Sequence, residues 1–195
     1  TSVSTTVVAD SSIHLIVGTA PVHTVGGKVN EPVYASNYAE AVAAMGYSDE
    51  WDKYDICEEI YSSFKLYSNG PIIMVNVLDP AKHLKGAETV EKTLAGGITE
   101  LPYEAVSDTV EVKGYDGEDS LTETYTRGED YDLFYTDGVL KLERIESGKI
   151  KADNARLNIK FNSVDPSKVT KKEIIGGYDT NTNKSSGFEL VDSVY

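Results

Sequence analysis

The sequence predicts a mixed fold of α+β and α/β character, in which a partial α/β layer (strand, helix, helix, strand) carries an inserted all-β domain. Two observations predict this class. Residues 13–78 pass from an apolar strand through two helical patterns to a second apolar strand. From about residue 100, apolar residues recur at every second position, which is typical of half-buried strands. We expect three parts: 1–85 is an incomplete α/β portion, 86–165 is a sandwich- or barrel-like all-β domain, and 166–195 is a return segment that starts a helix.

The first strand and the first helix have clear boundaries. The β-branched run 13–17 stops at Gly18 and predicts a buried strand. Residues 19–32 contain Gly, Pro and Asn and predict a loop. Ser36 or Asn37 can then cap a helix that ends at Gly46.

The second helix leads into a second strand. An apolar stripe at i, i+3, i+4 and i+7 predicts a helix over 54–67; it consists of Cys57, Ile60, Tyr61 and Phe64. The apolar run 72–78 predicts the next strand. Because two helices separate these strands, we expect a crossover connection and parallel pairing. Two strands make a poor sheet, so further strands must come from elsewhere in the chain or from residues outside it.

Within 86–165, the dipeptide Asp137-Gly138 predicts a two-residue hairpin turn. In that register Tyr135 faces Leu140 and Leu133 faces Leu142, which places four apolar side chains on one side. Alternation around Val112 and Ile159 and a turn at Ser147-Gly148 indicate five or six short strands in all. After Pro166 the pattern is helical again, and 187–195 predicts a helix.

Charge and composition exclude several classes of partner. The net charge of the 195-residue chain is −14, and the acidity is spread over both halves. A chain this negative repels phosphate, so we expect neither a nucleic acid nor an anionic membrane as a partner. The longest apolar run, 72–75, is too short to span a bilayer. The single Cys57 excludes an internal disulfide and fits a reducing compartment.

No catalytic, cofactor or metal site is predicted. Gly26-Gly27-Lys28 departs from a phosphate-binding loop, since Val22 and Val29 stand where Gly and Ser or Thr belong. No Gly-x-Ser-x-Gly elbow occurs. The histidines lack metal-ligand spacing; they are His14, His23 and His83. Cys57 lies on the apolar stripe, where a thiol acts as a small hydrophobe.

Two acidic segments are candidate ion-binding or acid–base sites. Asp179-Thr180-Asn181-Thr182-Asn183 begins like a calcium loop, but Lys184 replaces the required Gly and Leu190 replaces the bidentate Glu. We interpret it as a solvated turn, and weak ion binding stays open. Residues 116–137 hold eight carboxylates and a single cation, Arg127, which is typical of solvated faces and loops.

Several sequence blocks in series resemble the sheath protein of contractile phage tails, including tail-like prophage and bacteriocin-like particles. The blocks are 16–23 (IVGTAPVH), 31–33 (EPV), 45–47 (MGY), 76–83 (NVLDPAKH), 128–131 (GEDY), 164–169 (VDPSKV), 174–179 (IIGGYD) and 187–190 (GFEL). The resemblance covers nearly the whole chain and depends on their order and spacing.

The resemblance implies a structural subunit without catalysis or cofactor, located in the virion tail and assembled in the bacterial host cytoplasm. Such subunits form a homo-oligomeric helical tube around the inner tail tube protein, above a baseplate. Contraction of this tube drives the inner tube through the target envelope for genome injection. Terminal arms tie neighbouring subunits by adding strands to one another.

The family pattern is longer than this chain. We therefore expect the chain to be the N-terminal portion of a sheath protein, with residues 1–12 as part of an arm or as a disordered edge. The alternative is a protein- or glycan-binding module that uses Tyr-rich loops of the β-domain, with Tyr115, Tyr125 and Tyr131 as contact residues. Thirteen of the aromatic residues are Tyr, which fits either an interface or ordinary packing.

Overall fold

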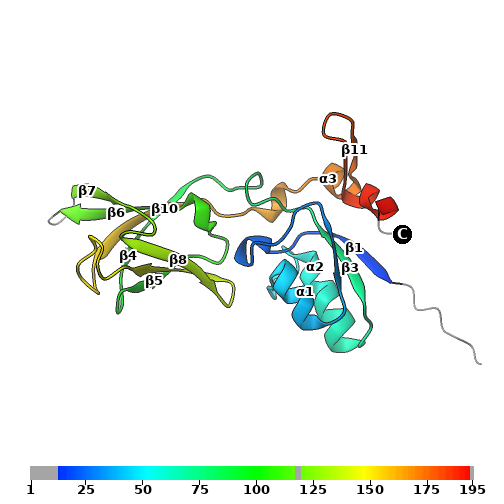
Figure 1. Cartoon of the computed structure of the whole chain (residues 1–195), viewed down its shortest axis with the longest axis horizontal. Coiled ribbons are helices and arrows are strands. Elements are labelled where there is room, and N and C mark those ends of the chain that lie inside the picture. The colour runs from blue at the N-terminus through cyan, green and yellow to red at the C-terminus, as the bar shows by residue number, and fades with distance from the viewer. Residues whose placement is uncertain (1–12, 117–119, 194–195) are drawn as a thin grey trace, which may run out of the picture.

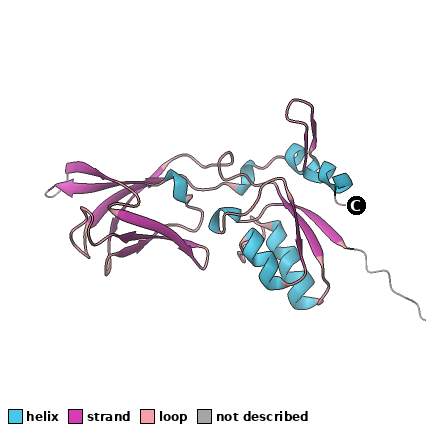
Figure 2. Cartoon of the chain, in the orientation of Figure 1, coloured by secondary structure: helices cyan, strands magenta, loops and turns pink. Residues whose placement is uncertain are grey.

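The computed structural model describes residues 13–116 and 120–193, and the expectation for residues 1–12 lies outside them. It contains two bodies, which Figure 1 shows joined by two connecting segments. One body carries the helices, and the other is built from strands (Figure 2). The connections pair through an isolated antiparallel bridge between Leu84 and Val164. The mixed class predicted from the sequence is confirmed.

The helical body contains a three-stranded sheet in the order β1-β3-β2. Strands β1 (His14–Gly18) and β3 (Ile72–Asn76) pair in parallel, as the crossover predicted. Strand β2 (Pro32–Ala35) pairs antiparallel with β3 and supplies the third strand. The sequence prediction of a loop reaching residue 32 missed β2, because it begins with Pro. An edge strand tolerates this residue, since its missing N–H is not needed on the outer side.

Two helices connect β2 to β3. Helix α1 (Tyr38–Met45) begins at Asn37, whose side chain accepts a hydrogen bond from the Glu40 N–H, and it ends at Gly46. Helix α2 (Asp55–Tyr61) continues into a π-helical turn, η2 (Ser62–Leu66), within the predicted range. A 3-10 turn, η1 (Val22–Thr24), lies in the loop after β1. Side chains of α1, α2 and the sheet form one core with Met45, Ile56, Ile60, Ile72 and Met74 fully buried.

The β-rich body contains two sheets. The first has the strand order β4-β10-β6-β7 and the second has the order β5-β9-β8. The seven strands are β4 (Glu88–Thr93), β5 (Ile98–Glu100), β6 (Glu111–Asp116), β7 (Ser120–Tyr125), β8 (Tyr131–Thr136), β9 (Val139–Arg144) and β10 (Arg156–Phe161). The sequence predicted five or six. It missed β4 and β5, which end at residues 93 and 100, before the alternating pattern begins. A 3-10 turn, η3 (Ser107–Thr109), precedes β6.

The predicted hairpin register is confirmed. Tyr135 pairs with Leu140 and Leu133 pairs with Leu142 across β8 and β9. Asp137 and Gly138 both have positive φ, as a type I′ turn requires. The inward side chains of both sheets form one cluster, which includes Leu140, Leu142, Leu157, Ile159 and Phe161.

The chain then returns to the helical body. It forms η4 (Pro166–Lys168), α3 (Lys171–Ile175), the hairpin β11 (Gly177–Asp179) and β12 (Lys184–Ser186), and η5 (Gly187–Ser193). The predicted helix from 187 is a 3-10 helix over its described residues, and the hairpin was not predicted because its residues are polar. Leu190 of η5 packs with Val17, Val75 and Val77 on the sheet.

Candidate functional site

The carboxyl ends of β1 and β3 lie together, which is where open α/β sheets usually bind ligands. Here the polar groups bind one another. The Asp55 carboxylate accepts hydrogen bonds from the N–H of Thr19 (2.5 Å) and from its hydroxyl (3.0 Å). Gly18 is needed at this point, since a Cβ there would lie 2.3 Å from Asp55 Oδ1. This contact fixes the start of α2 against the end of β1.

Asn76 fills the same edge from the other strand. Its buried Oδ1 accepts hydrogen bonds from the N–H groups of Ala20 and Leu78, both at 3.0 Å. Its Nδ2 donates to the Leu78 carbonyl at 2.8 Å. The amide therefore has its partners within the chain, and the edge holds the loops together instead of offering free groups to a ligand.

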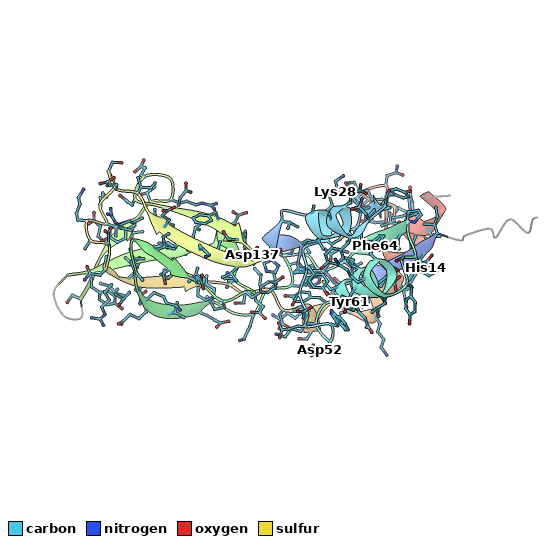
Figure 3. The ribbon with its side chains drawn as sticks, turned by 90° about the horizontal axis from the view of Figure 1, so that it is seen from below. His14, Lys28, Asp52, Tyr61, Phe64 and Asp137 are labelled. Atoms are coloured by element: carbon cyan, nitrogen blue, oxygen red, sulfur yellow. The ribbon has the colours of Figure 1, made fainter. Side chains whose placement is uncertain are left out.

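The three histidines lie apart and have separate surroundings. His14 lies on β1 (Figure 3), and its Nδ1 is 3.5 Å from the Glu59 carboxylate. Buried His83 accepts a hydrogen bond at Nδ1 from the Asp79 N–H and faces the Glu173 carboxylate with Nε2. His23 lies 3.0 Å from the Tyr103 carbonyl through Nε2. Within 13–116 and 120–193, no group of three or more His, Cys, Asp or Glu side chains is placed to hold a metal ion.

Cys57 is buried in α2, as its position on the stripe predicted. Burial raises the pKa of its thiol to about 11, so the reactive thiolate is disfavoured at neutral pH.

The segment 179–183 forms the loop between β11 and β12. Asp179 accepts hydrogen bonds from the Asn181 N–H (2.9 Å) and from the Thr182 hydroxyl (3.0 Å). These bonds lower the pKa of Asp179. The carboxylate therefore closes its own turn, which agrees with the interpretation as a solvated turn.

The carboxylates of the acidic segment 116–137 whose contacts the structure describes have separate partners. Asp130 is buried and accepts hydrogen bonds from the N–H groups of Thr126 and Lys149, both at 2.8 Å. Glu123 pairs with Lys149, and Arg127 pairs with Asp108. These described carboxylates serve turns and exposed ion pairs.

The tyrosines proposed for the binding alternative do not form one exposed surface. Tyr131 is only 3% exposed and belongs to the β core, against which Tyr125 also packs. Tyr115 lies under the Arg156 guanidinium and donates a hydrogen bond to Glu91. These positions do not support the binding-module alternative.

Aromatic residues instead join the two bodies. Tyr103, from the β-rich body, accepts a hydrogen bond from the His23 imidazole and donates its hydroxyl to the Tyr47 carbonyl at 2.8 Å. Its ring lies 6.3 Å from that of Tyr54. The turn residue Asp137 lies at the end of the β-rich body that faces the helical body (Figure 3). We call these contacts the joint.

The joint excludes water from several polar groups. Burial lowers the pKa of His23 and raises the pKa of Tyr54 and Tyr103. At its rim, Lys53 pairs with Glu104 at 3.0 Å. These contacts tie the two bodies to each other.

A groove of about 830 Å³ lies between the connection at 82–83 and the returning segment. We call it the lysine groove; it is lined by Lys82, His83, Lys168, Thr170, Lys172, Glu173, Gly176, Gly177, Tyr178, Asp179 and Ser186. The sequence did not reveal it, because its lysines come from segments about ninety residues apart. The spacing of Lys168 and Lys172 by four residues was the available signal.

The described residues contain no helix that is both long and apolar enough to cross a membrane. No family model matches the chain, and no solved structure matches it. The chain is 31% identical over 190 residues to a tail sheath protein of Burkholderia phage BcepMu. The match covers 96% of this chain and 36% of the relative, so the chain spans about a third of the relative's length. The resemblance drawn from the sequence blocks is thereby confirmed, and the chain is homologous to this tail sheath protein along almost all of its own length.

Proposed function

We propose that the chain is part of a structural subunit of a contractile phage-type tail sheath. The observation that carries the proposal is the match to a tail sheath protein over 96% of the chain. The filled edge of the sheet and the buried thiol support a structural role, because the groups best placed for chemistry bind other parts of the chain.

In the proposed role, sheath subunits assemble in the host cytoplasm into a helical tube around the inner tail tube, above a baseplate. Contraction of the tube drives the inner tube through the target envelope. The division into 1–85, 86–165 and 166–195 is part of this proposal. The packed joint supports it, since a contracting lattice transmits force best through bodies that keep their shape.

Negative-stain microscopy of the complete natural protein that contains this chain tests the proposal. Tubes or rings of regular diameter are expected at high protein concentration. Only monomers under all conditions of salt and concentration would contradict it. If a substitution at the joint, for example Tyr103→Ala, prevented tube formation, the contact between the two bodies would be needed for assembly.

A further inference from the structure

The outer face of the β5-β9-β8 sheet carries acidic residues around an exposed aromatic ring. Asp132 is paired with Glu143, and Phe134 is paired with Lys141, across β8 and β9. All four point away from the core, because Leu133 and Leu142 between them point into it. The Phe134 side chain is 37% exposed. We call Asp132, Phe134 and Glu143 the acidic face.

The negative charge of the acidic face is not neutralised within its own sheet. Lys141 pairs with Glu100 on β5 at 3.0 Å. No ion pair is formed by Asp132 or Glu143 with any described residue. Like charges directly opposite each other destabilise an antiparallel pair. An external cation would relieve this repulsion.

The lysine groove has the opposite balance. Its Glu173 carboxylate accepts hydrogen bonds from Lys82, His83 and Thr170, which hold the pKa of Glu173 well below its usual range. Its other carboxylate, Asp179, closes the 179–183 turn.

Two lysine charges therefore remain available in the lysine groove. Lys168 donates to the Leu84 carbonyl, which leaves its charge uncompensated, and Lys172 forms no ion pair with a described residue. The ring of Tyr178, 55% exposed, lies on the same groove.

The two surfaces cannot meet within one molecule. The lysine groove is lined in part by residues of α3 and β11. These elements lie at the opposite end of the molecule from the β5-β9-β8 sheet of the β-rich body (Figures 1 and 2). A contact between two different patches of identical chains is heterologous, and it propagates into rings or helical filaments.

We propose that a second copy of this chain docks its acidic face on the lysine groove. Phe134 of one copy packs against Tyr178 of the next, while Asp132 and Glu143 face Lys168 and Lys172. This inference rests on the proposed sheath function and names a subunit contact for it. Charge complementarity is the argument for a second copy as the partner: Lys168 and Lys172 form no ion pair with a described residue, and the same chain, of net charge −14, carries the matching carboxylates Asp132 and Glu143.

Sedimentation velocity of the 195-residue chain tests the contact at low salt and at about 0.5 M salt, where the Debye length is a few ångströms. We expect the average mass to rise above 21.2 kDa with concentration at low salt and to return to it at high salt. The variant K168E/K172E should weaken association about tenfold or more, and D132K/E143K should do the same. Combining all four substitutions in one chain should restore association.

The matched control is K113E/K151E, which makes the same change of net charge at exposed lysines of the β-rich body. It should associate like the wild type. A wild-type chain that stays monomeric throughout the concentration series would overturn the inference. So would association that K168E/K172E leaves unchanged, or a four-substitution chain that stays as weak as the two pairs separately.

Microscopy of the complete protein separates this inference from the proposed function. Tubes formed equally well by the wild type and by K168E/K172E would overturn the contact and leave the sheath function standing. Salt-sensitive association of the chain without any tube or ring from the complete protein would overturn the sheath function and keep the contact.

Discussion

The two bodies of this molecule are built from the chain in different ways. All seven strands of the β-rich body come from one continuous stretch, between Glu88 and Phe161, and they share one core. The helical body combines β1 to β3 with residues that follow the β-rich body in the chain, such as Val169 and Leu190. Its buried side chains fall into three separate clusters.

The β-rich body therefore takes all its strands from one continuous stretch of chain, whereas the helical body needs residues from both sides of that stretch. The buried side chains of the β-rich body's core all come from residues 94–161. Among residues 13–116 and 120–193, it is the returning segment that supplies the side chains covering one face of the helical body's sheet. Trp51, the sole tryptophan, lies in the helical body, so its fluorescence reports that body separately from the strands.

The largest expected effect comes from the β core. Leu142→Ala removes a fully buried side chain and should lower the free energy of unfolding by about 2–5 kcal/mol. We expect the far-ultraviolet circular dichroism transition of the strands to shift more than the Trp51 transition. Leu121→Ala, at an exposed position on β7, is the control. Equal shifts of both signals would mean that the two bodies unfold as one unit.

A substitution at the carboxyl end of β1 should lower the stability of the helical body instead. Gly18→Ala brings a Cβ to 2.3 Å from Asp55 Oδ1 and should break the hydrogen bonds to Thr19. Losing a hydrogen bond to a charged group costs about 1.5–3 kcal/mol. We expect the free energy of unfolding to fall by this amount when denaturant unfolding is followed by Trp51 fluorescence. Gly86→Ala meets no atom within 4 Å and serves as the control. If the two alanine variants were equally stable, the hydrogen bonds between Asp55 and Thr19 would not contribute to the stability of the fold.

The joint should set how far the bodies unfold together. Tyr103→Phe removes the hydroxyl that donates to the Tyr47 carbonyl and should cost about 1 kcal/mol. It should also widen the separation between the circular dichroism and Trp51 midpoints. Tyr115→Phe removes an exposed hydroxyl in the β-rich body and should leave that separation unchanged. A separation that is the same in both variants would argue against coupling through Tyr103.

The smallest expected effect is a dependence on pH at the same joint. Burial lowers the pKa of His23 from 6.5, so the unfolded chain binds more protons there than the folded chain. The contribution of neutral His23 to the free energy of unfolding is therefore fully present above about pH 6.5. It is lost as the pH falls below that value. Unfolding followed by Trp51 at pH 7.5 and 5.5 measures this change. His23→Gln should reduce the difference between the two pH values, while His14→Gln, at a half-exposed side chain, should preserve it.

The features that were predictable from sequence are those that short-range chemistry determines. The Asp137-Gly138 turn gave the register of β8 and β9, and Asn37 and Gly46 gave both ends of α1. Strand β2 was missed because Pro32 looks like part of a loop until its place at a sheet edge is known. The β11–β12 hairpin was missed because Gly177 to Ser186 is almost entirely polar and lacks an apolar alternation.

The candidate surfaces were less predictable, since they depend on three-dimensional neighbours. Tyr131 seemed suited to an exposed loop and is instead part of the β core. The pairing of Glu173 with Lys82 and His83 joins residues ninety positions apart, which no local pattern reveals. The order and spacing of the sequence blocks indicated the tail sheath family, which hydrophobic periodicity alone could not.

The bridge between Leu84 and Val164 brings the two ends of the β-rich body side by side. The N–H groups of Lys85 and Asp165 donate to the carbonyls of Ser163 and His83, both at 2.8 Å, so the chain enters and leaves the β-rich body as a paired ribbon. Paired strands lie about 5 Å apart, which a tight turn can close. The β-rich body is therefore an inserted domain whose two ends are adjacent. Another folded unit with adjacent termini can replace it without lengthening the path through the helical body.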